Sequence, residues 1–365
     1  MRVFDLGQTV PGMTPRLFGR AHGESYRPLI KEIAAIRVGL AVESGAFDHR
    51  SDVLDAARDH LPLLERYCSS LHDELLGIAE GADVTPEEIV VVNHYTDLKD
   101  LRGSERGAVM NRPADDDCSM LYATTGESPL FGQTWDMHGS AMGYVMMMRV
   151  PEFDERPSAW LLSIVGCLGM AGLSADGVGG GINNLRCTDA KVGVVWPALV
   201  RRALAAGSAE SARDTILGAT LGSGHHYFFA DEAKGFSIEV SGSQSAVLEE
   251  LWCEEKSLFI HTNHCLSDEI RPFAVVAKDS TTYERYSTLQ KALEGSPIAR
   301  WEDLWLQLGS HEGYPDSVCT HRSSPENPHG IATCAGLVVD FRARWVRAAA
   351  GCIHGARPHV FGWSE

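Results

Sequence analysis

The sequence has no long hydrophobic run. No stretch reaches the roughly 18 uninterrupted apolar residues that a membrane-spanning helix needs. The start, MRVFDLGQTVPGMTP, also lacks the basic and apolar regions of a secretory signal. From these two absences we expect a cytoplasmic protein that does not associate with membranes.

Positive charge is scarce. The 365 residues include 32 Lys and Arg against 49 Asp and Glu, which gives a formal net charge of −17 with His neutral. Proteins that bind nucleic acids or anionic membrane surfaces gather positive charge to meet phosphates, so this composition excludes both classes of partner. Because 44% of the residues are hydrophobic and 22% are charged, we expect a globular protein with a large core.

The cysteines form no recognisable pattern. There are nine, an odd number at irregular spacings without a C-x-x-C pair, which excludes a zinc ribbon and argues against a disulfide framework. The segment His261-Thr262-Asn263-His264-Cys265 invites a metal interpretation, but its H-x-x-H-C spacing is not that of H-E-x-x-H and no further paired ligands accompany it. We therefore predict no metal and no cofactor, and expect most cysteines to be structural.

Two common catalytic motifs are also missing. The glycine-dense segment Gly172–Leu185 lacks the G-x-G-x-x-G spacing of dinucleotide-binding proteins, and Ser174 is not part of a G-x-S-x-G nucleophile elbow. The better interpretation is a tight strand-turn-strand that brings backbone close to a site.

The patterns that are present divide the chain near residues 103–118. Before this boundary, apolar periodicity predicts helices over 26–40 and 53–79, and Thr85-Pro86-Glu87-Glu88 has the form of a helix start. After it, helices are predicted at 196–206, 208–217, 283–293 and 301–308. Strands are predicted at 119–124, 130–136, 143–150, 160–165, 169–174, 226–230, 236–240, 245–249, 257–262, 335–340 and 345–350. Without regular βαβ alternation, this order favours an α+β fold with antiparallel sheets.

Cys118 lies where the acidic segment 112–117 meets the first predicted strand. If the bond between Asp117 and Cys118 breaks, the cysteine becomes N-terminal. Its own α-amine, with a pKa of about 7.7 to 8.0, is then available to take the thiol proton. We therefore single out Cys118 as the candidate nucleophile.

Two other residues fit a site around this thiol. Asp136, on the return strand of the predicted hairpin, could accept a hydrogen bond from the new ammonium or orient a substrate amine. Asn263, at a predicted strand end, could direct its side-chain N–H at a developing oxyanion. An alternative is a cysteine hydrolase of another kind that uses His261 or His264 as its base.

A substrate pocket is predicted from apolar residues near these motifs. Methionines can line an adaptable acyl pocket, although they are more often part of a core. The candidates are Met120, Trp135, Met142, Met146, Met147 and Met148.

Several segments of the sequence, taken together, resemble the acyl-coenzyme A:isopenicillin N acyltransferase-like family (peptidase family C45) of the N-terminal nucleophile hydrolases. The matching segments are Leu75–Ile89, Asp116–Ser119, Gly132–Asp136, Gly172–Leu185, His261–Cys265, Ser317–Arg322 and Thr333–Asp340. The resemblance implies a four-layer αββα sandwich made as an inactive precursor that cuts itself before the nucleophilic cysteine. Segments 1–117 and 118–365 would then be the two chains of one compact domain.

The resemblance also implies roles for single residues. Cys118 would be the nucleophile, Asp136 the acid beside it and Asn263 the oxyanion donor. The basic residue of the family's site would be Arg322, with His321 equally close to the motif. The sequence departs from the family's pattern with Asp117 in place of a glycine, Met120 in place of a hydroxyl residue and Gly351 in place of a proline.

From these observations we predict a self-processing amidohydrolase of small acyl-amides, such as an N-acylated or β-alanyl-type amine. Acyl-coenzyme A-dependent N-acyl transfer is the alternative, and it is weakened because no Lys/Arg cluster is present to receive the coenzyme's phosphates. A non-enzymatic relative of the fold is a third interpretation. The expected partners are a small amide substrate and the two fragments of the same precursor.

Overall fold

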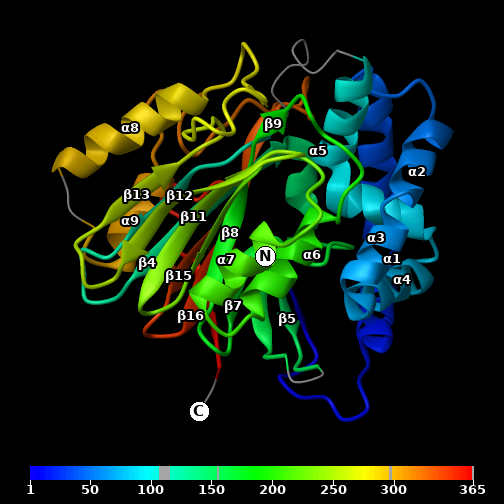
Figure 1. Ribbon diagram of the computed structural model, residues 1–365, viewed down its shortest axis with the longest axis horizontal. Coiled ribbons are helices and arrows are strands. Elements are labelled where there is room, and N and C mark those ends of the chain that lie inside the picture. The colour runs from blue at the N-terminus through cyan, green and yellow to red at the C-terminus, as the bar shows by residue number, and fades with distance from the viewer. Residues whose placement is uncertain (107–115, 154–155, 296–297, 364–365) are drawn as a thin grey trace.

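The computed structural model describes residues 1–106, 116–153, 156–295 and 298–363. Two large β-sheets are stacked face to face between two layers of helices (Figure 1). This is the four-layer αββα sandwich that the resemblance implied, and it confirms the predicted fold class. Most of the acidic segment 112–117 lies outside the described residues.

The N-terminal third is helical, as predicted. It contains α1 (Pro15–Glu43), α2 (Arg50–Arg58), α3 (Leu61–Tyr67), α4 (Ser69–Ala82) and α5 (Pro86–Arg106). The prediction of one helix over 53–79 is wrong, because Cys68 is extended (φ −159°, ψ 94°) and separates α3 from α4. The predicted start of α5 is confirmed by reciprocal hydrogen bonds between Thr85 and Glu88.

The first sheet has the strand order β1-β5-β6-β7-β8-β10-β11-β12. Its strands are β1 (Arg2–Asp5), β5 (Val145–Val150), β6 (Ala159–Ile164), β7 (Ala171–Ser174), β8 (Gly179–Asn184), β10 (His225–Ala230), β11 (Lys234–Val240) and β12 (Ser245–Trp252). The glycine-dense segment forms the β7–β8 hairpin, as predicted, with Gly177 at φ +94° in its turn. The parallel pairing of β1 with β5 was not predicted.

The second sheet has the order β13-β3-β4-β15-β16-β17, and β2 pairs with β4 beside this path. Its strands are β2 (Asp116–Asp117), β3 (Met120–Ala123), β4 (Leu130–His138), β13 (Leu258–His261), β15 (Ile331–Asp340), β16 (Trp345–Ala350) and β17 (His359–Gly362). The β3–β4 hairpin is the one that the sequence predicted. Two short strands, β9 (Arg186–Cys187) and β14 (Ala274–Val275), pair separately.

Helices cover the outer faces of both sheets. The short helices α6 (Trp196–Leu204) and α7 (Ala209–Leu217) join α1–α5 in the layer on the first sheet, while α8 (Thr282–Gly295) and α9 (Trp301–Leu308) cover the second sheet (Figure 1). A 3-10 helix, η2 (Gly139–Tyr144), follows β4. Among the described residues, no helix combines the length and the apolar character needed to cross a membrane.

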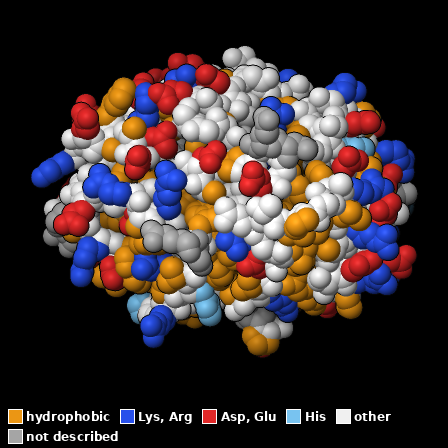
Figure 2. Space-filling model, turned by 90° about the horizontal axis from the view of Figure 1, so that it is seen from below, with side chains coloured by type: hydrophobic (Ala, Val, Ile, Leu, Met, Phe, Trp, Pro, Cys, Tyr) orange, Lys and Arg blue, Asp and Glu red, His pale blue; other side chains and the backbone are white. Residues whose placement is uncertain are grey.

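One hydrophobic core connects the helical third with both sheets. It extends from Phe4 in β1 to Phe361 in β17 and includes residues before and after Cys118. A smaller apolar cluster joins the second sheet to α8 and α9. On the face shown in Figure 2, acidic and basic side chains lie interspersed around hydrophobic patches, so the negative excess is not gathered in one place on that face.

Candidate active site

Cys118 lies between β2 and β3, in the wall of a cavity between the two sheets. The residue is 5% exposed. The empty space of the cavity is about 460 Å³, a figure that includes open solvent. Its lining comes from both sheets and from two helices: Thr96, Cys118, Gln133, Trp135, Asp136, Met137, Leu162, Met170, Ala171, Ile182, Asn184, Trp196, His225 and Leu337.

Asn263 holds the backbone of the candidate nucleophile. The peptide nitrogen of Cys118 donates to Oδ1 of Asn263 at 2.6 Å. The side-chain nitrogen Nδ2 of Asn263 donates to the Asn184 carbonyl at 2.9 Å, and its backbone nitrogen donates to Oγ1 of Thr282 at 2.8 Å. The structure thus places Asn263 beside Cys118, and the amide oxygen of Asn263 makes the contact.

Arg285 of α8 is the basic residue that contacts Cys118. Its fully buried guanidinium donates to the Cys118 carbonyl at 2.7 Å and to Oδ1 of Asn263 at 2.9 Å. It also donates to Ser119 Oγ at 2.8 Å. Sequence reasoning missed this residue, although one signal was available: Arg285 is four residues before buried Leu289, so it lies on the apolar side of α8.

The residue before the candidate nucleophile is paired with the same arginine. Arg285 donates to Oδ1 of Asp117 at 2.8 Å, and 1% of the Asp117 side chain is exposed. The hydroxyls of Ser280 and Thr281 donate to the two carboxylate oxygens at 3.3 and 3.4 Å. A buried charge needs such compensation, and the ion pair explains why an aspartate is accommodated beside Cys118.

Asp136 lies directly opposite Asp117 in the antiparallel β2–β4 pair. Its side chain is fully buried. Burial raises the pKa of Asp136 to about 7, although Arg285 and hydrogen bonds from the hydroxyls of Thr333 and Thr134 oppose the rise. Oδ1 of Asp136 has no hydrogen-bond partner in the described part of the chain, so this oxygen is available to a new donor in the cavity.

Arg322, the basic residue chosen from the sequence, lies elsewhere. Its guanidinium contacts Asp316 and the carbonyl of Asp279. The alternative candidate, His321, contacts His311 and Cys319. The position beside Cys118 that the resemblance assigned to a basic residue is occupied by Arg285.

Of the predicted pocket residues, the structure places some in the cavity wall and others away from it. Trp135 lines the cavity. Met120, Met146 and Met148 are buried in strands and are not part of its lining. The methionines that do line it are Met137 and Met170.

The two histidines of the alternative cysteine-hydrolase interpretation have other partners. Nε2 of His261 is 2.8 Å from Glu239, and the His261 ring stacks on His226 at 3.6 Å between centroids. Nδ1 of His264 is 3.0 Å from the Thr282 hydroxyl. Burial lowers the pKa of His264 to about 4.

A further histidine gives the cavity wall a polar group. Nε2 of His225 is 3.1 Å from each carboxylate oxygen of Asp97. Burial raises the pKa of Asp97, but the neighbouring histidines, His225 first, outweigh it and lower the pKa to about 2. Nδ1 of His225 has no partner among the described residues.

The fold is an αββα sandwich with a cysteine in the wall of a cavity between its two sheets. A family model described as acyl-coenzyme A:6-aminopenicillanic acid acyl-transferase matches residues 123–351, and the chain belongs to this family. It is therefore an enzyme that acts on amides.

The proteins similar to the chain include a curated relative and two solved structures. The relative is the 40 kDa form of acyl-coenzyme A:6-aminopenicillanic-acid-acyltransferase from Emericella nidulans, 22% identical over 91% of this chain and 88% of its own. Penicillin V acylase from Agrobacterium tumefaciens is 11% identical over 67% of this chain and 84% of its own, with a TM-score of 0.43. A mutant conjugated bile acid hydrolase from Clostridium perfringens is 10% identical over 68% and 97%, with a TM-score of 0.44.

Proposed function

We propose that the chain is a self-processing cysteine amidohydrolase that cleaves a small acyl-amide through a thioester on N-terminal Cys118. One observation carries this proposal. Asn263 and Arg285 hold the peptide nitrogen and the carbonyl of Cys118, while the residue forms part of the wall of a cavity between the two sheets. Binding both backbone groups of a single cysteine fixes its position relative to the bond before it.

Maturation begins with attack by Cys118 Sγ on the carbonyl carbon of Asp117. A carbon–sulfur bond forms, the Asp117–Cys118 C–N bond breaks, and the thiol proton passes to the leaving nitrogen. Water then hydrolyses the thioester, which leaves a carboxylate on Asp117 and a free thiol and α-amine on Cys118. Asn263 already accepts a hydrogen bond from the leaving nitrogen in the intact chain.

Asp136 is suited to carry the proton in this step. With a pKa raised to about 7, its carboxyl exchanges a proton readily near neutral pH. Its Oδ1 has no other partner in the described chain. After cleavage the same oxygen can accept a hydrogen bond from the new ammonium.

The two fragments are expected to stay together after cleavage. The main hydrophobic core contains side chains from both 1–117 and 118–365, and β1 pairs with β5 across the cleavage point. Separation would expose this shared core to water, which is strongly unfavourable. The mature enzyme is thus proposed to be a two-chain form of one compact domain.

In catalysis the free amine of Cys118 takes the thiol proton, and the thiolate attacks the substrate carbonyl. Asn263 Oδ1 and the Arg285 guanidinium keep the N-terminal residue in place. The oxyanion role predicted for Asn263 requires its Nδ2 to exchange the Asn184 carbonyl for the substrate oxygen. The contacts support a positioning role for Asn263 more directly.

The cavity favours an apolar acyl group with one polar feature. Side chains such as Leu162, Ile182 and Leu337 make most of its wall apolar. Nε2 of His225 faces Asp97, and Nδ1 has no partner among the described residues. We propose that Nδ1 forms a hydrogen bond with a polar group of the substrate.

Acyl transfer is the second candidate, because the curated relative is named as an acyl-coenzyme A-dependent acyltransferase. Both reactions share the thioester on Cys118 and differ only in what resolves it. Water gives hydrolysis, and an amine gives transfer.

The test is to trap the acyl-enzyme. Purified protein is mixed with a panel of N-acylated amines, quenched in acid and digested, and the peptide that begins at Cys118 is analysed by mass spectrometry. We expect that peptide to carry the acyl group, and limiting iodoacetamide to label Cys118 far faster than the other cysteines. Turnover with acylation at a different cysteine, or equal labelling of all cysteines, would contradict the proposal. Added amine acceptors and acyl-coenzyme A distinguish transfer from hydrolysis.

A further inference from the structure

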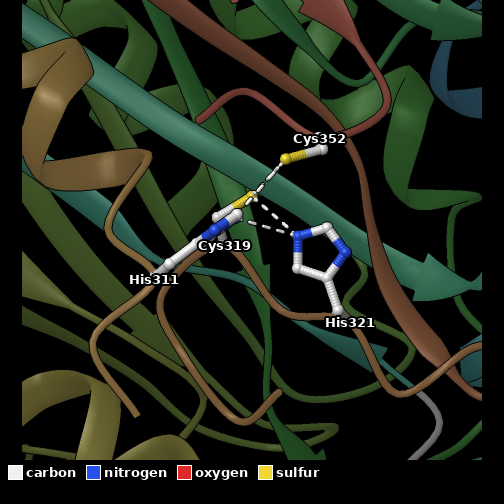
Figure 3. A group of neighbouring side chains, drawn as sticks. All are labelled: His311, Cys319, His321 and Cys352. Carbon is white, nitrogen blue, oxygen red and sulfur yellow. Dashed lines mark hydrogen bonds between the residues drawn. The ribbon is translucent and has the colours of Figure 1, made fainter. Parts of the chain in front are cut away.

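Four metal-binding side chains converge outside the proposed active site. Their ligand atoms all lie within 4.8 Å of one another. The side chains point toward a common centre (Figure 3). We call this group the His2Cys2 cluster; it consists of His311, Cys319, His321 and Cys352.

The distances in the cluster are close to those of a zinc tetrahedron. Bonds of about 2.3 Å to sulfur and 2.0–2.1 Å to nitrogen give tetrahedron edges of about 3.8 Å between sulfurs, 3.3 Å between nitrogens and 3.6 Å for mixed pairs. The two sulfurs are 3.7 Å apart and the two Nε2 atoms are 3.1 Å apart. The mixed distances are 3.6 Å for Cys319–His321 and 3.4 Å for Cys352–His311. Four of the six edges therefore match the geometry of one tetrahedral ion.

The ligands come from three separate segments. His311 follows α9, Cys319 and His321 precede β15, and Cys352 follows β16. The connection 309–330 between α9 and β15 contains no regular helix or strand. Such long irregular connections are uncommon within compact domains unless something ties them down. An ion bound here would fasten this connection to the end of β16.

The four side chains are partly shielded from water. Cys319 is buried, and His311, His321 and Cys352 are half-buried. An ion bound between them would be partly enclosed by protein.

We propose that the His2Cys2 cluster binds one Zn²⁺ ion in a closed structural site. Two sulfurs and two imidazole nitrogens in tetrahedral arrangement are the ligand set that zinc favours over calcium or magnesium. Four protein ligands leave no open position for a substrate, so the ion stabilises the fold and takes no part in acyl transfer. The sequence prediction missed the site because its ligands follow no short motif.

Thr333 in β15 lies between the two sites. It pairs with Asp136 across the β15–β4 ladder. Its hydroxyl accepts a hydrogen bond at 2.9 Å from the backbone nitrogen of Thr320, which lies between the proposed ligands Cys319 and His321. The ion would therefore hold the segment that contacts Thr333, the residue opposite Asp136, which makes Thr333 a positioning residue.

The direct test is metal analysis of the full-length protein purified without a metal-affinity column. We expect one zinc per chain by inductively coupled plasma mass spectrometry. After removal of zinc with a chelator, titration with Co²⁺ should produce the intense visible bands of a tetrahedral ion and a thiolate charge-transfer band, saturating at one equivalent. Neither readout depends on the acylase activity, so the zinc proposal and the proposed function can fail separately.

Matched variants locate the ion. Cys352→Ser and His321→Ala should each lower Zn²⁺ affinity by more than about tenfold and abolish the charge-transfer band or change it. Cys68→Ser is the control, because this half-buried cysteine contacts Ser70 and lies outside the cluster. It should keep one zinc per chain.

Three results would overturn the proposal. One is wild-type protein without zinc that gives no tetrahedral Co²⁺ spectrum. Another is a Cys319–Cys352 disulfide in protein purified under reducing conditions. The third is unchanged zinc content in folded Cys352→Ser and His321→Ala. If the variants do not fold, the Co²⁺ titration of the wild-type chain still decides the question.

Discussion

The peptide nitrogen of Cys118 donates a hydrogen bond to Oδ1 of Asn263 at 2.6 Å, although the two residues are 145 positions apart in the sequence. The nitrogen is the leaving group of the proposed cleavage and becomes the catalytic amine. One side chain therefore contacts the same atom in the precursor and, in our account, in the mature enzyme. Our first prediction follows from this dual use.

Asn263→Asp and Asn263→Ala should have different effects. Aspartate retains an acceptor for the Cys118 nitrogen but loses the Nδ2 donor, whereas alanine loses both. We expect Asn263→Asp to self-cleave and to lose on the order of 10²-fold in kcat if Nδ2 is the oxyanion donor. Asn263→Ala should neither self-cleave nor turn over substrate. Time-resolved intact mass measures cleavage, and equal cleavage rates in the two variants would contradict the positioning role.

Arg285 and Arg322 form a matched pair for a second prediction. Replacing Arg285 with Met leaves the buried Asp117 carboxylate without its partner, so we expect a loss of about 3–5 kcal/mol in the free energy of unfolding and no cleavage. Arg322→Gln removes a more exposed ion pair and should cost about 0–1 kcal/mol, with activity retained. Urea unfolding and intact mass report both effects. Loss of cleavage in Arg322→Gln, but not in Arg285→Met, would restore Arg322 as the basic residue of the site.

The buried carboxyl of Asp136 predicts a pH-dependent stability. Because the pKa is raised to about 7 in the folded chain, from a usual value of 3.8, the contribution of this group is fully present below about pH 4 and is lost as the pH rises through 7. In a Cys118→Ala background, which stays uncleaved, Asp136→Asn should remove this loss. The difference in unfolding free energy between the two proteins should change by up to about 4 kcal/mol from pH 4 to pH 8. If the unfolding free energies of the two proteins change with pH in parallel, the Asp136 pKa is not raised.

The cavity wall gives a fourth prediction. Ala171 lines the cavity, so Ala171→Phe should fill part of it and lower kcat/KM for long acyl chains by at least about tenfold, while short acyl chains are less affected. Met148→Leu is the control, because Met148 is buried in β5 and lies outside the lining. Steady-state kinetics with acyl chains of increasing length make the comparison. Selective loss of long-chain activity in Met148→Leu alone would place the acyl group elsewhere.

The secondary structure was largely predictable, because local patterns determine it. The Thr85–Glu88 capping box predicted the start of α5, and the turn residues between two β-type runs predicted the β3–β4 hairpin. The strands β1 and β17 were missed. They are short edge strands, whose pairing is decided by distant partners.

The candidate site was predictable only where a residue carried a local signal. Cys118 precedes a recognisable strand and Asn263 follows one. The structure brings the two residues into contact. Arg285 has no motif, and its importance arises from burial against Asp117 and Cys118, which depends on how α8 packs. The His2Cys2 cluster was missed for the same reason, since its ligands come from three segments.

The most direct measurement for the central claim is the intact mass of the purified protein under denaturing conditions, with wild type beside Cys118→Ala. We predict two masses for the wild type, corresponding to residues 1–117 and 118–365, and one full-length mass for the variant. A wild-type chain that remains a single species while turning over amides at a normal rate would contradict the account.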